Sequence, residues 1–100
     1  MYIAMNRFRI YAGHEADFEK IWSERDSYLD KVTGFREFHL LRGETVDKIT
    51  IYVSHSVWES RESFQDWTRS ESFRKSHAHA QSPGGTLEGH PKFEGYEIVI

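Results

Sequence analysis

The sequence predicts an α+β fold whose elements follow the order β-α-β-β-α-β. Three observations lead to this fold class. Apolar and polar residues alternate with a period of two at 2–11 and 48–58, apolar residues recur at helical spacing at 15–31 and from 61 onward, and glycines or capping residues separate these stretches. The order is that of the ferredoxin-like split arrangement. One hundred residues without a linker or an internal repeat predict a single domain, 1–100.

The first half of the chain predicts a strand, a helix and a second strand. One face of the strand 2–11 carries Ala4, Asn6, Phe8 and Ile10. The helix 15–31 begins after Gly13, shows apolar residues such as Phe18 and Trp22 at helical spacing, and ends at Gly34. A second strand is expected at 35–42, with a turn at Arg42-Gly43-Glu44.

The second half predicts the clearest strand, a capped helix, a long loop and a closing strand. The strand 48–58 alternates throughout, and Ser60 is a favourable N-cap for a helix that begins at Arg61. Ser70 is a candidate second cap, so the helix is expected to kink or restart there. The stretch 81–92 contains three glycines and both prolines and predicts a loop of the kind that forms lids or binding segments. Residues 93–100 predict the last strand.

Composition excludes several classes of protein. The absence of cysteine excludes disulfides, thiol nucleophiles and thiolate ligands to a metal or to haem. A net charge of −3, with no basic stripe, gives no attraction to nucleic acid. No apolar run is long enough to cross a membrane, and Asn6, Arg7 and Arg9 interrupt what would be a signal-peptide core. The expectation is a soluble, cytoplasmic protein.

The segment 64–77 carries the chemistry that stands out most. It contains Phe64, Trp67, Phe73 and His77, and the chain as a whole is 15% aromatic. Ten residues of straight helix span about 15 Å, so Trp67 and His77 flank one flat ligand only if the helix bends near Ser70. An imidazole ligand, a bulky ring and a buried amide from Asn6 together suit a flat, iron-containing ligand.

Each of these residues also has a simpler interpretation. Trp67 considered alone is more often a core residue, a histidine at a helix end is more often a surface residue or a cap, and Asn6 is equally explained by hydrogen bonds at a β-bulge. His79 forms an H-x-H pair with His77, but helical residues two apart point in nearly opposite directions. His77 continues the face of Phe73 and is therefore the better candidate ligand.

At the level of motifs, the chain resembles the antibiotic biosynthesis monooxygenase (ABM) superfamily, and within it the haem-degrading monooxygenases. The resemblance rests on N-R-F at Asn6–Phe8, G-F at Gly34-Phe35, V-W-E-S at Val57–Ser60, and F-x-x-W-x-x-S-x-x-F-x-x-x-H from Phe64 to His77. It covers nearly the whole chain. It implies a homodimer with the dimeric α+β barrel fold. Two ferredoxin-like protomers form one β-barrel, and each protomer has one haem site.

The resemblance also implies roles for individual residues. His77 would be the axial ligand of the haem iron, and Trp67 would press on the porphyrin and ruffle it. Asn6 would donate a hydrogen bond near the bound oxygen or the distorted ring, with Phe64 and Phe73 completing the haem pocket. Haem would be both substrate and cofactor, O2 the oxidant, and a reductase or small-molecule reductant the external electron donor. The products would be free iron and a linear tetrapyrrole.

Three other functions remain open from the sequence. A cofactor-free monooxygenase of polycyclic phenols or quinols would have the same fold, and Asn6, Trp67 and His77 would activate its substrate. A non-catalytic haem-binding protein would use His77 without ring opening. A ligand-sensing or purely structural dimer would need the three residues only for packing.

Overall fold

The computed structural model describes residues 1–24, 29–71, 73–74 and 86–100. The elements, in chain order, are β1 (Tyr2–Tyr11), α1 (Glu15–Glu24), a short 3-10 helix (Leu29–Lys31), β2 (Phe35–Val46), β3 (Ile49–Trp58), α2 (Arg61–Thr68) and β4 (Lys92–Glu97). The predicted order β-α-β-β-α-β is confirmed.

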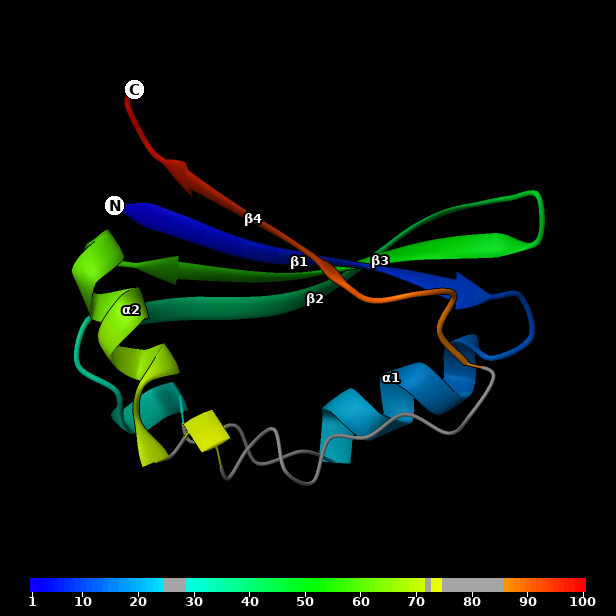
Figure 1. Ribbon diagram of the computed structural model, residues 1–100, viewed down its shortest axis with the longest axis horizontal. Helices are drawn as coiled ribbons and strands as arrows, with labels where there is room; N and C mark the ends of the chain where they lie inside the picture. Colours follow the sequence, from blue (N-terminus) through cyan, green and yellow to red (C-terminus); the bar gives the residue numbers. More distant parts are fainter. Residues whose placement is uncertain (25–28, 72, 75–85) are drawn as a thin grey trace.

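A single four-stranded sheet organises the chain. Its strand order is β2-β3-β1-β4, and all three neighbouring pairs are antiparallel. Both helices cover the same face of the sheet, so the molecule has two layers (Figure 1). This is the ferredoxin-like α+β arrangement. None of the described helices is long and apolar enough to span a membrane.

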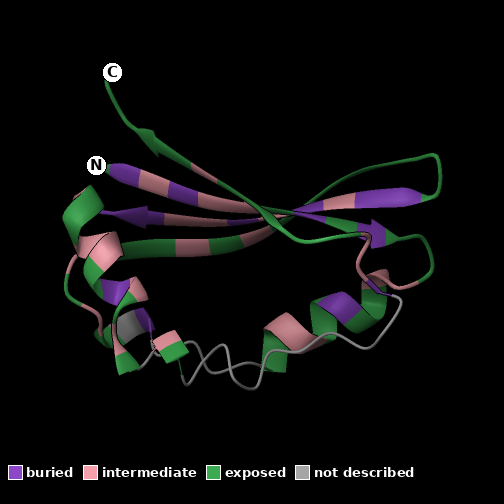
Figure 2. Cartoon of the chain, viewed as in Figure 1, coloured by how far each residue is buried: buried purple, intermediate pink, exposed green. Residues whose placement is uncertain are grey.

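The core between the sheet and the helices divides into two apolar clusters. One contains Tyr2, Ala4, Leu29, Trp58 and Trp67, and the other contains Phe8, Ile10, Phe18 and Tyr52. Figure 2 shows buried positions along β1 and β3 and on both helices. On β1, Asn6 falls between Ala4 of the first cluster and Phe8 of the second. On β3, Ser54 falls between the same two clusters. The polar positions therefore mark the place where the two clusters separate.

The hairpin between β2 and β3 differs from the expectation. The predicted turn at 42–44 is wrong, because β2 continues to Val46 and the chain reverses at Asp47 and Lys48, which have φ angles of 51° and 66°. The register shifts between Arg42 and Thr45 instead. A Cβ at Gly43 would lie 3.3 Å from the carbonyl oxygen of Ile51. The glycine therefore permits a close approach at an irregularity within the strand, a use that sequence alone does not separate from a turn.

Two other element ends also differ. The predicted helix 15–31 is described as α1 to Glu24 and as a 3-10 helix from Leu29, with 25–28 outside the described residues. The last strand ends at Glu97 and does not reach Ile100. Its partner β1 begins at Tyr2, which pairs with Glu97, so the residues beyond have almost no strand left to pair with. Val99 and Ile100 are accordingly exposed.

Candidate functional site

A cavity of about 590 Å³ lies between the helix side of the sheet and the two helices. Its volume falls in the range typical of small-molecule sites, about 300–1,000 Å³. None of the described lining residues is charged, and most are apolar or aromatic. They are Ala4, Asn6, Phe8, Phe18, Ile21, Trp22, Leu29, Phe38, Ser54, Ser56, Trp58, Phe64, Trp67, Thr68, Phe73, Leu87, Pro91 and Phe93.

Stacked aromatic rings form one wall of this cavity. The rings of Trp58 and Trp67 lie 6.3 Å apart at an interplanar angle of 28°, and Phe73 meets Trp67 edge-on at 5.5 Å. Phe64 stacks almost parallel on Phe93 of β4, with centroids 5.6 Å apart. Flat, interlocked rings of this kind present rigid apolar surface to a flat ligand.

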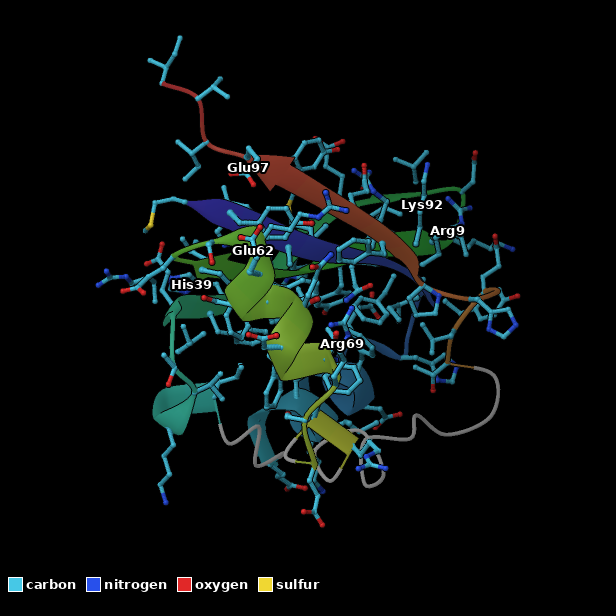
Figure 3. All side chains as sticks on the ribbon, turned by 60° about the vertical axis from the view of Figure 1, so that its left-hand side comes forward. Arg9, His39, Glu62, Arg69, Lys92 and Glu97 are labelled. Carbon is cyan, nitrogen blue, oxygen red and sulfur yellow. The ribbon has the colours of Figure 1, made fainter. Side chains whose placement is uncertain are left out.

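Two helix caps place these rings. The N-cap at Ser60 is confirmed, since its Oγ accepts a hydrogen bond from the Ser63 amide at 3.1 Å. Helix α2 ends at Thr68, and the break predicted at Ser70 is also confirmed: Ser70 Oγ accepts from the Phe73 amide at 3.1 Å and donates to the Trp67 carbonyl at 2.6 Å. The new turn starting at Ser70 brings Phe73 to the same cavity as Trp67. Figure 3 shows the exposed side of α2, marked by Glu62 and Arg69.

Trp67 satisfies both interpretations that the sequence left open. Its side chain is 6% exposed and belongs to the core cluster around Trp58, and it also lines the cavity. The tryptophan is therefore a core residue whose remaining surface is available to a ligand.

Asn6 lies on the cavity-lining face of β1, between β3 and β4. Its cross-strand partners are Ser54 and Phe93, and the pairing of β1 with β3 runs without a shift from Tyr2 to Tyr11. The β-bulge that would have explained a buried amide is therefore absent. Within the part of the chain that the structure describes, the Asn6 side chain makes no hydrogen bond, and it lines the cavity.

The predicted axial ligand, His77, lies outside the described residues, as does its neighbour His79. Phe73, four positions before His77 in the sequence, lines the cavity. Among the described residues, no group of three or more His, Asp or Glu side chains has the geometry of a metal site.

The histidines that the structure describes lie away from the cavity. His39 and His55 face each other across β2 and β3, with ring centroids 6.5 Å apart, on the sheet face that the helices do not cover. The side chain of His39 is 60% exposed. His39 is therefore an exposed residue of the uncovered sheet face and not a core residue.

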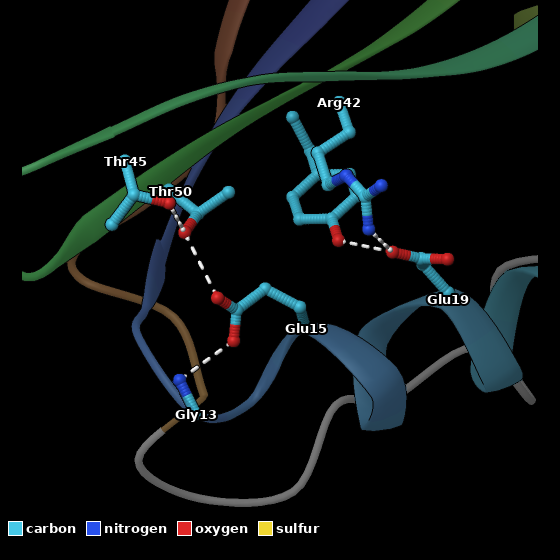
Figure 4. A network of polar contacts seen from close by, with 7 residues as sticks. Gly13, Glu15, Glu19, Arg42, Thr45 and Thr50 are labelled. Atoms are coloured by element: carbon cyan, nitrogen blue, oxygen red, sulfur yellow. Dashed lines mark hydrogen bonds and ion pairs between the residues drawn. The ribbon is translucent and has the colours of Figure 1, made fainter.

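A second hollow, of about 680 Å³, lies beside α1 and was not anticipated from the sequence. Glu19 Oε2 accepts hydrogen bonds from the Tyr52 hydroxyl at 2.5 Å and from Arg42 Nη1 at 3.1 Å (Figure 4). Burial, together with the Glu19 carboxylate, raises the pKa of Tyr52 to about 12. The stacked rings of Trp22 and Phe38 line both hollows, with centroids 5.7 Å apart.

At the first residue of α1, Glu15 connects the start of the helix to the sheet by hydrogen bonds. Its carboxylate accepts from the Gly13 amide at 2.6 Å and from the Thr50 hydroxyl at 3.1 Å, and Thr50 in turn contacts Thr45 at 2.7 Å (Figure 4). Backbone hydrogen bonds lower the pKa of Glu15. These contacts fix α1 against β2 and β3, and so hold Phe18 and Trp22 of that helix at the cavity.

Comparison with known proteins identifies the family. The family model for antibiotic biosynthesis monooxygenase matches residues 1–79. The chain belongs to the antibiotic biosynthesis monooxygenase family. Asn6, Phe64, Trp67, Phe73 and His77 all fall within the matched part of this ABM chain.

Individual relatives of this ABM chain include haem-degrading proteins. The heme oxygenase (mycobilin-producing) of Mycobacterium tuberculosis is 28% identical over 92 residues, which cover 92% of this chain and 86% of that protein. The solved structure of the heme-degrader MhuD from the same organism, with two hemes bound in its active site, matches with a TM-score of 0.75 and 26% identity, covering 100% of this chain and 97% of that one.

The fold also extends to an enzyme of another kind. The structure of SnoaB from Streptomyces nogalater, a cofactor-independent oxygenase, matches with a TM-score of 0.70 and 19% identity, covering 99% of this chain and 93% of that one. The ABM fold thus occurs in oxygenases with and without a cofactor.

Proposed function

We propose that this ABM monooxygenase degrades haem, which binds in the 590 Å³ cavity and is opened there to a linear tetrapyrrole with release of iron. The observation that carries the proposal is the Asn6 amide, which has no hydrogen bond within the described structure and lies in a cavity whose described lining, with Trp58, Trp67 and Phe64, carries no charge. A fully buried, unpaired amide costs about 1–3 kcal/mol, and the lower end of that range applies to the half-buried Asn6 amide unless a ligand bonds to it.

The chemistry of the lining suits a flat macrocycle. The rings offer dispersion and stacking contacts over a wide apolar surface, and Asn6 offers one fixed hydrogen-bonding group. The similarity to a protein named as a heme oxygenase adds support at 28% identity. Bound haem would supply the iron that activates O2, with electrons from an external donor.

Each residue has a distinct part in this proposal. Trp67 packs against the rings of Trp58 and Phe73, so it would hold its position against a bound porphyrin and would favour a distorted macrocycle. Asn6 orients a polar atom through its amide. His77 is the proposed axial ligand, on the strength of the motif that ends with it.

The proposed assembly is a homodimer formed through the uncovered face of the sheet. On that face Ile3, Met5, Ile51 and Val53 are only half-buried, and Leu41 is 46% exposed. A second copy of the sheet would cover these side chains, as the α+β barrel requires. The electron donor and the cytoplasmic location stay predictions from the sequence.

A haemin titration of the purified protein tests the function. We expect a saturable Soret shift at about one haem per chain, followed, on addition of a reductant in air, by loss of the Soret band and release of iron. The decay must persist in the presence of catalase, because free peroxide also destroys haem. A stable Soret band under these conditions would make the protein a haem carrier or sensor.

A cofactor-free monooxygenase of polycyclic phenols or quinols is the second candidate. The aromatic cavity, whose described lining carries no charge, and the Asn6 amide also suit a flat phenol, whose hydroxyl would bond to the amide. The absence of any Soret shift, together with O2 consumption in the presence of a polycyclic quinol, would favour this reading over haem degradation.

A further inference from the structure

We propose that Ser54 is a second ligand-binding residue of the cavity, whose hydroxyl acts together with the Asn6 amide on the same polar atom of the bound ligand. The inference rests on the proposed function, because it takes the haem complex as the occupant of the cavity. It deepens that function by replacing a single hydrogen-bonding group with a pair.

Register places the two side chains next to each other. Asn6 of β1 and Ser54 of β3 are direct cross-strand partners, and both line the cavity. Side chains directly opposite in an antiparallel pair have Cβ atoms about 4.5–5.5 Å apart and point to the same side of the sheet. A single small acceptor is therefore within reach of both groups.

The Ser54 hydroxyl is available for this role. The residue is 6% exposed, and its side chain makes no hydrogen bond within the described residues. Of the side-chain nitrogen and oxygen atoms described, only Thr86 Oγ1 is both unpaired and wholly inaccessible. Ser54 Oγ thus keeps accessible surface, and the space that it borders is the cavity.

The other hydroxyls among the described lining residues are already engaged. Ser56 Oγ donates to the Ala4 carbonyl at 3.2 Å and accepts from Trp58 Nε1 at 2.9 Å. Thr68 Oγ1 donates to the Gln65 carbonyl at 2.7 Å, within its own helix. Among the described amide and hydroxyl side chains that line the cavity, Asn6 and Ser54 are therefore the two without a protein partner.

Packing alone does not explain a serine at this position. Residue 54 lies in a central strand between Tyr52 and Trp58 on the core face, where a valine or isoleucine would bury more apolar surface and favour the strand. An unpaired hydroxyl among aromatic rings lowers stability unless something in the cavity bonds to it. Two adjacent hydrogen-bonding groups fix the position of a ligand atom between them, whereas a single group lets that atom swing about one hydrogen bond.

Two substitutions of equal shape isolate the hydroxyl. Ser54→Thr keeps it and Ser54→Val removes it, and both side chains suit a strand. The probe is fluoride bound to the ferric haem complex, since fluoride accepts hydrogen bonds. We expect the fluoride Kd of Ser54→Val to exceed that of Ser54→Thr by about five- to tenfold, the effect of one net hydrogen bond. The ratio of the two fluoride Kd values should change in the Asn6→Leu background, where the partner amide is missing, because the two groups act together.

The outcomes separate the inference from the function on which it rests. Equal fluoride Kd values for Ser54→Val and Ser54→Thr, with normal haem binding in both, would refute the role of Ser54 and leave haem degradation standing. Failure of the unsubstituted protein to bind haem would refute both. If the ratio of fluoride Kd values for Ser54→Val and Ser54→Thr is unchanged in the Asn6→Leu background, the two groups act independently and the proposed joint action is refuted.

Discussion

Replacing Asn6 with leucine should make the ligand-free protein more stable and abolish its activity. Leucine has nearly the shape of asparagine but no polar atoms, and it would extend the apolar contacts of Ala4 and Phe8 across the gap between the two core clusters. A substitution that removes a polar side chain usually destabilises a protein when that side chain is hydrogen-bonded. The opposite sign is expected here because the Asn6 amide has no bond within the described structure to lose.

The size of the effect follows from the partial burial of Asn6. A fully buried, unpaired amide costs about 1–3 kcal/mol, and Asn6 is half-buried beside a cavity large enough for water, so the lower end of that range applies. The expected gain in the free energy of unfolding is about 1 kcal/mol. For a domain of this length, it corresponds to a rise in Tm of about 4–8 °C.

The assay is urea denaturation of the haem-free protein, with Ser56→Ala as the matched control. Ser56 also lines the cavity from a central strand, but its hydroxyl accepts from the indole N–H of the fully buried Trp58. Removing that acceptor should lower the free energy of unfolding by about 1–3 kcal/mol. Two polar residues of one cavity are thus expected to shift stability in opposite directions.

Either of two results would refute this reasoning. A loss of stability in Asn6→Leu of about 1 kcal/mol or more would show that the amide is bonded in the native protein and has a structural role. A stabilised variant that still degrades haem at the original rate would show that Asn6 takes no part in the chemistry.

The remaining predictions concern the ring wall, the proposed axial ligand and the second hollow. Trp67→Phe should still bind haem, but with less ruffling and slower degradation, because a smaller ring presses less on the porphyrin; unchanged turnover, read together with the resonance Raman marker bands of the haem, would contradict that role. His77→Ala should abolish or greatly weaken haem binding in the titration, and an unaltered Soret band and affinity would remove His77 as the ligand. The pKa of Tyr52 is raised from 10.0 to about 12, so the folded protein holds this proton more tightly than the unfolded chain does. The corresponding stability is complete below about pH 10 and is lost as the pH rises toward 12. The free energies of unfolding of the wild type and of Tyr52→Phe should therefore converge as the pH rises across this interval. A constant difference between the two would indicate an unperturbed phenol.

Local signals in the sequence were sufficient for the strands and caps but not for every element end. The alternation in β1 and β3 and the caps at Ser60 and Ser70 depend on residues close together in the chain, and the structure confirms them. The end of β4 depends on where β1 begins, and the use of Gly43 depends on the approach of Ile51 from the neighbouring strand. Such contacts are non-local, and no pattern within a single segment contains them.

The candidate site likewise contains residues that local sequence patterns identify and residues that only non-local contacts identify. Trp67, Phe64 and Phe73 could be found from one helix and its break, and Asn6 stood out as a polar residue on an apolar strand face. Ser54 and Ser56 could not be distinguished, because they are the same residue type on the same face of one strand. Their difference is set by Trp58, whose indole bonds to Ser56 and not to Ser54. Whether a polar side chain is engaged in the fold or available to a ligand depends on its partners in space. The pair Asn6 and Ser54 combines two positions that are 48 residues apart in the sequence and become adjacent only through the register of β1 and β3. For that reason the measurement that separates function from packing is the response of stability to losing the polar group, and not the identity of the residue.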